Sequence, residues 1–216
     1  MYTVWLRCNC LAGKCVFGVF LLLDMRRHYP NPSQTPNDQK LRELILFVSE
    51  RSEGDASFGS VKLNKLLFYA DFLAYLEFGR AITWQKYQKL ENGPCPRRML
   101  PILHDLENDQ DIAVVDRKYH GYTQKRTVAL REPDLSMFSA DEIGLVTQLI
   151  DEFWGKNAAQ ISDASHDFVG WRLANIGEDI PYEAALAKFA DQASAPKLSS
   201  RFKKELLKRD DELRTH

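Results

Sequence analysis

The sequence predicts a mainly helical domain of the α+β class, a compact helical fold that carries one small β-hairpin. Three observations support this prediction. Apolar residues recur with helical spacing in several segments, the longest of which covers residues 61–78. Two short apolar runs, residues 111–115 and 127–131, flank a polar stretch centred on Gly121, as the strands of a hairpin do. With 216 residues, 44% of them hydrophobic, the chain is also long enough to bury a substantial core.

The first two helices are indicated by caps and by apolar spacing. Thr35-Pro36 combines a residue suited to cap a helix with a proline suited to its first turn. Residues 61–78 are apolar around most of the cylinder, which is typical of a helix at the centre of a core. Gly79 predicts the end of that helix, because glycine readily adopts the conformation of a C-terminal cap. The first helix has a single apolar face, made of Leu41, Leu44, Ile45 and Val48.

The next part of the chain is expected to contain an extended stretch, a turn and a third helix. Residues 81–90 favour a short extended stretch, and Asn92-Gly93-Pro94 is typical of a turn. Pro96 is suited to the start of the third helix. The apolar face of that helix is expected to hold Met99, Leu100, Leu103 and Leu106.

A hairpin and then further helices are expected after this. The predicted strands, residues 111–115 and 127–131, are joined by a long polar loop, residues 116–126. Ser139 and Glu142 have the spacing of a capping box, and apolar residues in helical phase follow them. Weaker helical patterns cover residues 158–165, 182–190 and 198–213.

These elements predict three parts of the chain: an N-terminal extension of residues 1–35, a domain of residues 36–190, and a linker with a charged C-terminal helix in residues 191–216. Within the extension, residues 15–23 are apolar but shorter than the roughly 20 residues that a membrane-spanning helix needs. Three interpretations stay open: a start codon placed too early, a signal-like or membrane-associated segment, and a folded extension. We expect the extension to lie outside the domain.

Charge and cysteine placement exclude several classes of protein. The chain has 29 basic and 30 acidic residues and a formal net charge of -1. It is therefore neither disordered throughout nor a generally basic nucleic-acid-binding protein. Cys8, Cys10 and Cys15 lie close to the N-terminus, and Cys95 stands alone. This spacing fits neither a secreted disulfide scaffold nor a zinc site, so we expect a reduced, cytoplasmic protein.

The sequence contains no convincing catalytic, cofactor or metal motif. Ser165-His166-Asp167 has the residue types of a catalytic triad, but three neighbouring residues cannot normally stack as a triad requires. His104, His120 and His166 lack the helical spacing of a zinc motif. Glycine-rich phosphate-binding motifs are also missing from the sequence. We therefore expect a protein that is not an enzyme and has no cofactor, with an enzyme centred on His166 as a less favoured alternative.

The predicted hairpin loop is a candidate contact surface. In residues 116–126, basic side chains alternate with aromatic ones, a pattern that can pair with phosphates and stack on bases. A surface that contacts a partner protein and a solvated tip without a role remain alternatives. The C-terminal helix adds Phe202 on an amphipathic, mostly charged surface. The candidate partner-binding residues are Arg117, Lys118, Tyr119, Tyr122, Lys125 and Phe202.

Three segments together resemble a known family. The first is Lys62–Asp71 with the sequence KLNKLLFYAD, and the second is Asn92-Gly93-Pro94. The third is Ile161–His166, followed by Gly170-Trp171 and by Gly177 and Ile180-Pro181-Tyr182. In this order and spacing they resemble the SocA-like Panacea domain of bacterial and phage antitoxins, over roughly residues 38–190. The matching positions are Lys65, Leu66, Tyr69, Gly93, Pro94, Ser165, His166 and Trp171.

This resemblance implies a phage-associated or bacterial antitoxin that is not an enzyme. Such a protein neutralises a cognate toxin, encoded by an adjacent gene, through direct contact, and the SocA branch delivers its toxin to a ClpXP-type protease. The resemblance supplies no catalytic residue, so the matching positions are expected to form the framework of the fold. Asn92 stands where the family usually has an aromatic residue. The alternative hypothesis is a nucleic-acid-binding regulator that uses the basic and aromatic residues of the loop, and no membrane partner is expected.

Overall fold

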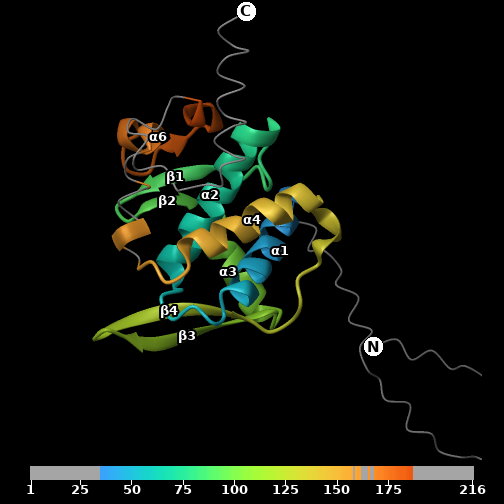
Figure 1. Cartoon of the computed structure of the whole chain (residues 1–216), viewed down its shortest axis with the longest axis vertical. Helices are drawn as coiled ribbons and strands as arrows, with labels where there is room; N and C mark the ends of the chain where they lie inside the picture. The colour runs from blue at the N-terminus through green and yellow to red at the C-terminus, as the bar shows by residue number, and fades with distance from the viewer. Residues whose placement is uncertain (1–34, 158, 162–164, 166–167, 187–216) are drawn as a thin grey trace, which may run out of the picture. The chain divides into compact units, whose positions relative to one another are not determined.

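The computed structural model describes residues 35–157, 159–161, 165 and 168–186 (Figure 1). Expectations for the extension, for His166 and for Phe202 with the C-terminal helix lie outside the described residues. The first half of the described chain contains α1 (Pro36–Arg51), α2 (Ser60–Phe78), β1 (Tyr87–Leu90), β2 (Gly93–Pro96) and α3 (Met99–Asn108). The second half contains β3 (Ile112–Tyr119), β4 (Tyr122–Ala129), the 3-10 helix η1 (Leu135–Met137), α4 (Ala140–Phe153), α6 (Val169–Leu173), β5 (Asp179–Ile180) and the 3-10 helix η2 (Tyr182–Ala185).

The helix ends follow the predicted caps. The Thr35 hydroxyl accepts a hydrogen bond from the backbone N–H of Asp38 at 3.2 Å, and the Asp38 carboxylate accepts one from the Thr35 N–H at 3.4 Å. Ser139 and Glu142 form the same capping box at the start of α4. Gly79 ends α2 with a φ of +70°, a left-handed conformation that suits glycine. A capping side chain of this kind typically stabilises a helix by about 1 kcal/mol.

The start and the buried face of α3 differ from the prediction. Pro96 does not open the helix but pairs with Tyr87 as the last residue of β2, and the helix begins at Met99. Its buried face is formed by Met99, Ile102 and Leu106, whereas Leu100 is 78% exposed. The helix packs so that Ile102, rather than Leu100, faces the core, and Leu103 is partly buried against it.

A three-stranded antiparallel sheet of order β2-β1-β5 was not predicted. Glu91 and Asn92 form the turn between β1 and β2, so Gly93 and Pro94 belong to the strand rather than to the predicted turn. The strand cannot be recognised in the sequence, because three of its four residues are glycine or proline, which are uncommon in strands. They are tolerated because β2 is an edge strand, where a missing N–H need not interrupt a ladder.

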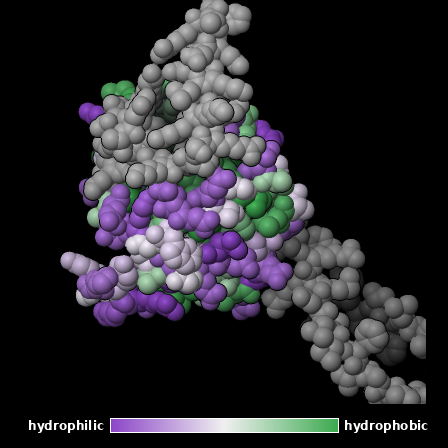
Figure 2. Space-filling view, in the orientation of Figure 1, coloured by the Kyte–Doolittle hydropathy of each residue, from purple (hydrophilic) through white to green (hydrophobic). Residues whose placement is uncertain are grey.

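The predicted β-hairpin is present, but the prediction of a long loop between its strands is wrong. β3 and β4 pair in register from Ile112 opposite Ala129 to Tyr119 opposite Tyr122, which leaves a two-residue turn. Both turn residues, His120 and Gly121, have a positive φ, as a type I′ turn requires. The loop was predicted because residues 116–125 are polar. In the structure they form the outer part of a two-stranded ribbon, made of β3 and β4, that projects from the domain and is largely hydrophilic at its end (Figures 1 and 2).

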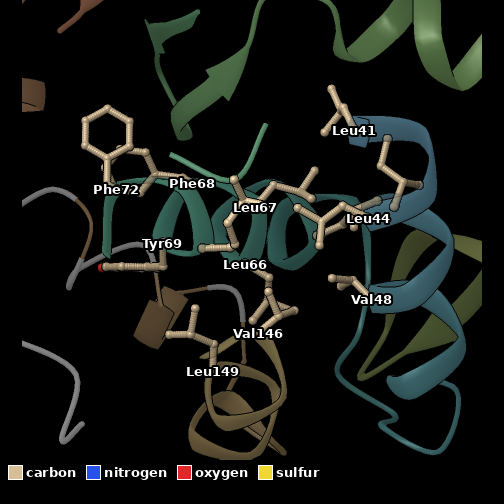
Figure 3. Packing of buried hydrophobic residues seen from close by; sticks show 14 of the residues in the cluster. Leu41, Leu44, Val48, Leu66, Leu67, Phe68, Tyr69, Phe72, Val146 and Leu149 are labelled. Atoms are coloured by element: carbon tan, nitrogen blue, oxygen red, sulfur yellow. The ribbon is translucent and has the colours of Figure 1, made fainter. Parts of the chain in front are cut away.

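The core is built around α2. Nearly every side chain from Lys62 to Ala74 is buried. Figure 3 shows α1 on one side of α2 and α4 on another, with their apolar side chains directed toward it. Burying one such leucine or phenylalanine typically stabilises the fold by about 1.5–3 kcal/mol. The predicted central helix and the α+β class are therefore confirmed.

Aromatic rings connect α2 to later parts of the chain. The Phe68 ring lies 5.2 Å from that of Phe168, and the Phe72 ring lies 4.7 Å from that of Tyr182, measured between ring centroids. These contacts hold the segment around α6 and η2 against the three-stranded sheet and α2. Among the described helices, none has the length and apolar character needed to cross a membrane.

Candidate functional site

Three family-like positions that are distant in sequence meet at one buried point, which we call the Lys65 cluster (Lys65, Gly93, Cys95 and Ser165). The Lys65 amine on α2 donates a hydrogen bond to the carbonyl oxygen of Asn92 in the β1–β2 turn. A Cβ atom on Gly93 would lie 1.5 Å from the Lys65 Nζ atom and 3.2 Å from the Ser165 hydroxyl oxygen. Gly93 also has a φ of +110°, which side chains rarely adopt. This point in the fold therefore requires glycine.

Burial controls the charges in the Lys65 cluster. Lys65 is 0% exposed, and burial lowers the pKa of its amine to about 8, although its interaction with Cys95 opposes this shift. Burial raises the pKa of the Cys95 thiol to about 11, although the positive charge of Lys65 opposes this rise. A protonated, buried thiol is a poor nucleophile. The arrangement thus joins α2 to the three-stranded sheet and has no activated cysteine.

The other family-like positions lie in the surrounding framework. Leu66 and Tyr69 are buried in the core on α2, as Figure 3 shows. Pro94 is buried in β2, next to Gly93. Trp171 on α6 is half-buried, and the amine of Lys89 lies 4.2 Å from its ring centroid, a distance typical of a cation–π contact.

A buried carboxylate on α2 was missed by sequence reasoning. Asp71 is fully buried and accepts hydrogen bonds from the backbone N–H of Thr83 at 2.6 Å, from the Thr83 hydroxyl and from the Tyr87 hydroxyl at 2.8 Å. Burial raises the pKa of Asp71, although these hydrogen bonds oppose the rise. The signal in the sequence was a charged residue within an otherwise apolar helix, which in a folded protein needs buried partners.

A second buried network lies between α2 and the end of α4. The Lys62 amine lies 2.5 Å from the Asp55 carboxylate and 3.0 Å from the Ser57 hydroxyl, and it also donates to the carbonyl oxygens of Phe153 and Lys156. Burial lowers the pKa of Lys62, and its pairing with Asp55 opposes this shift. This network anchors the loop that precedes α2.

Arg126 is a structural residue and not a free cation of the hairpin. It is 2% exposed, and its guanidinium donates to the carbonyl oxygens of Asp55 at 2.8 Å, of Ser52 at 3.0 Å and of Glu53. These carbonyls belong to the C-terminal end of α1 and the residues after it. The interpretation of residues 116–126 as one basic surface is therefore wrong at Arg126, because burial and three acceptors commit it to the fold.

The remaining candidate contact residues of the hairpin divide between the two faces of the ribbon. In the observed register, Arg117 lies opposite Gln124, and Tyr119 lies opposite Tyr122, all on one face. On the other face, Lys118 lies opposite Thr123 and donates a hydrogen bond to its hydroxyl at 3.0 Å, and Asp116 lies opposite Lys125. The ribbon therefore has one face with two tyrosines and an arginine and another with mixed charges.

A groove of about 600 Å³ separates the ribbon from the N-terminal turn of α2. Gln124 holds the ribbon beside this turn, because its amide donates to the carbonyl oxygen of Ser57 at 3.0 Å and its side chain lies over Gly59. A Cβ on Gly59 would come within 2.5 Å of the Gln124 side chain. The groove, called the ribbon groove below, is lined by Ser57, Gly59, Ser60, Val61, Lys62, Tyr119, His120, Tyr122, Thr123, Gln124, Lys125, Asn157 and Ala159.

Two of the three histidines weighed as metal ligands, His104 and His120, lie in the described part of the chain. There, no three histidine, cysteine, aspartate or glutamate side chains are grouped so that they could hold a metal ion. His104 instead lies within 3.0 Å of the Asn108 side chain on α3, and the His120 ring packs on Tyr119 in the hairpin turn.

Comparison with known proteins identifies the family. The model of the family described as "Antitoxin SocA-like, Panacea domain" matches residues 63–172, slightly more than half of the 216 residues. The chain therefore belongs to the SocA-like Panacea antitoxin family. The match contains most of α2, the β1–β2 hairpin, the ribbon, α4 and most of α6, and thus the whole Lys65 cluster. Neither the curated proteins nor the solved structures gave a significant match.

Proposed function

We propose that this protein neutralises a cognate toxin by direct contact, without catalysing a reaction, and that the tip of the β3–β4 ribbon contributes to the contact surface. The ribbon tip is defined here as residues 115–125. Membership of the antitoxin family supports the general role. The ribbon tip supports the site because it projects from the domain and carries side chains that the core does not use (Figure 1).

The exposure of the ribbon tip is the observation that carries this assignment. Tyr122 is 78% exposed, and Arg117, Lys118 and Lys125 are exposed as well. Exposed aromatic and arginine side chains are the types that most often dominate the binding energy of protein interfaces. Arg126 is committed to the fold and Asp116 adds a negative charge on the face of Lys125, so the tip is less basic than the sequence of residues 116–126 suggests. A protein partner is thus favoured over nucleic acid.

The experiment is co-expression with the adjacent reading frame. The neighbour expressed alone should stop growth, and co-expression of this protein should restore growth and give a complex that co-purifies. Y122A should weaken the complex at least tenfold, whereas L100A should leave it unchanged, because Leu100 is equally exposed but lies on α3. A harmless neighbour, or rescue without a complex, would contradict the proposal.

Two further measurements distinguish finer mechanisms. If toxin half-life falls when this protein is co-expressed, and the fall requires a ClpXP-type protease, the protein acts as an adaptor for degradation. If it retards operator DNA with a steep dependence on salt, phosphate contacts dominate and the nucleic-acid alternative replaces the contact proposed here. Inhibition with an unchanged toxin half-life and no DNA shift supports neutralisation by contact alone.

A further inference from the structure

The ribbon groove reaches the free edge of β4. Tyr122, Thr123, Gln124 and Lys125 are consecutive residues, and all of them line the groove. Consecutive side chains of a strand point to opposite faces. Tyr119, Tyr122 and Gln124 share the face that turns toward α2, whereas Thr123 and Lys125 belong to the other face, so the groove lies over one face of the ribbon and reaches the edge of β4.

This edge has no strand beside it in the described part of the chain, where β3 and β4 form a sheet of two. On an edge strand, about half of the backbone N–H and C=O groups point away from the partner strand. These groups can pair with an added extended segment, which is a common mode of peptide recognition. The ribbon groove thus combines an open strand edge with space for a chain beside it.

The charge of the lining selects the kind of segment. Among the described residues that line the groove, none is an aspartate or glutamate. Lys62 is already paired with Asp55, but Lys125 is exposed and forms no ion pair within the described residues. The first turn of α2, which also borders the groove, contains no acidic residue. Tyr119, Tyr122, Val61 and Ala159 supply apolar surface beside these charges.

We propose that the ribbon groove binds an extended, acidic segment of the toxin, which pairs with the edge of β4 and places carboxylates near Lys125. This inference rests on the proposed function and names the kind of partner segment that the ribbon tip recognises. Apolar side chains of the segment lie against Tyr119, Tyr122 and Val61, and its carboxylates lie near the Lys125 amine. Such a partner fits the groove better than nucleic acid, because one free lysine cannot follow a phosphate backbone.

The test uses the full-length protein and two labelled peptides, (Glu-Val)₄ and (Lys-Val)₄, measured by fluorescence anisotropy. The acidic peptide should bind at least tenfold more tightly than the basic one. K125E and T123P should each weaken binding of the acidic peptide at least tenfold, through lost charge and a blocked edge, respectively. K86E is the matched control, because Lys86 is exposed but adjoins β1, outside the groove. Amide hydrogen exchange should slow at residues 122–125 when the acidic peptide binds.

Equal affinity for both peptides, an unchanged Kd for K125E, or protection away from β4 would overturn the inference. Tighter binding of a 20-nucleotide single strand than of the acidic peptide would also overturn it. Circular dichroism and the unfolding midpoint show whether T123P folds, and K125E tests the charge independently of that result. Co-expression distinguishes failure of the groove inference from failure of the proposed function. If K125E and T123P still rescue growth, the groove does not bind the toxin, but the proposed neutralisation stands. If the unmodified protein fails to rescue growth, the proposed function itself is wrong.

Discussion

The amine of Lys65 occupies the space that a side chain at position 93 would need, since a Cβ atom on Gly93 would lie only 1.5 Å from Lys65 Nζ. The first residue is on the central helix and the second is on an edge strand, and the hydrogen bond from Lys65 to the Asn92 carbonyl fixes their distance. The three-stranded sheet can therefore lie this close to α2 only because residue 93 is a glycine and has no side chain.

We expect G93A to destabilise the domain by about 3 kcal/mol, because it combines backbone strain at positive φ with displacement of a buried amine. Urea unfolding measures this loss. G121A is the matched control: Gly121 also has a positive φ, but a Cβ there would meet nothing within 4 Å. It should cost only the backbone strain, about 1–2 kcal/mol. Equal losses at the two positions would exclude a steric role for Lys65.

The pH dependence of stability should report the buried amine of Lys65. Its pKa is about 8 in the folded protein and 10.5 without the protein environment. Between these values the unfolded chain binds more protons, so the stability of the native protein rises with pH over this range. Compared with K65M, which cannot titrate, the native protein should gain about 3 kcal/mol between pH 8 and 10.5.

Measurement of urea midpoints across this range removes the contributions of titrating groups that do not interact with Lys65, because they are common to both proteins. Since Lys65 and Cys95 interact, both proteins carry C95A in this comparison. Below about pH 8 the difference between the two proteins should stay constant, since the amine is charged in the folded and unfolded states alike. A difference that is flat up to pH 10.5 would show that the amine keeps an ordinary pKa and is not desolvated.

Local signals in the sequence were sufficient to predict α1, α2, α4 and the β3–β4 hairpin, but they were insufficient to predict the three-stranded sheet. α1, α2 and α4 could be predicted because caps such as Thr35 and Ser139 and the apolar spacing are local properties. β2 contains Gly93, Pro94 and Pro96, and only its place at the edge of a sheet makes these residues acceptable. That place depends on the pairing of β2 with β1, which in turn pairs with β5, and no local pattern records these pairings.

The same limit applies to the candidate site. Lys65 could be identified from its segment, but its contact with Asn92 joins residues 27 positions apart and had no separate signal. Arg126 was grouped with its basic neighbours in the sequence. Its three acceptors, carbonyl oxygens at and after the end of α1, are more than 70 positions away, and nothing in the sequence connects them with Arg126. Charged residues inside the apolar helix, such as Lys62 and Asp71, were the available clue to buried networks.

Arg126 should be essential for stability, in contrast to its exposed neighbours on the ribbon. R126M leaves the carbonyl oxygens of Ser52, Glu53 and Asp55 without their donor, so we expect a loss of about 2–4 kcal/mol in the free energy of unfolding. R126K should be intermediate, because one ammonium cannot reproduce the planar set of guanidinium donors. R117M, at an exposed position on β3, should change stability by about 0.5 kcal/mol or less. Equal effects of R126M and R117M would restore Arg126 to the candidate contact surface.

The ion pair between Asp55 and Lys62 should be costly to break from one side. Their side chains are 3% and 2% exposed, so D55N leaves a buried ammonium without its counter-charge and should destabilise the domain by about 3 kcal/mol. E152Q is the control, since the Glu152–Lys156 pair on the surface should contribute about 0.5 kcal/mol or less. The double variant D55L/K62M removes both charges and should be more stable than D55N.

Acid titration tests the same pair independently. Burial alone would raise the pKa of Asp55, but hydrogen bonds from Lys62 and Ser57 outweigh burial and hold the pKa below its ordinary value of 3.8. The charged carboxylate therefore stabilises the fold fully above about pH 5, and this stabilisation is lost as the pH falls through the lowered pKa. The difference in unfolding free energy between the native protein and D55N should be constant from about pH 5 to 7 and should shrink below about pH 4. A difference that does not change down to pH 2 would show that the lost stability comes from packing and not from the charge of Asp55.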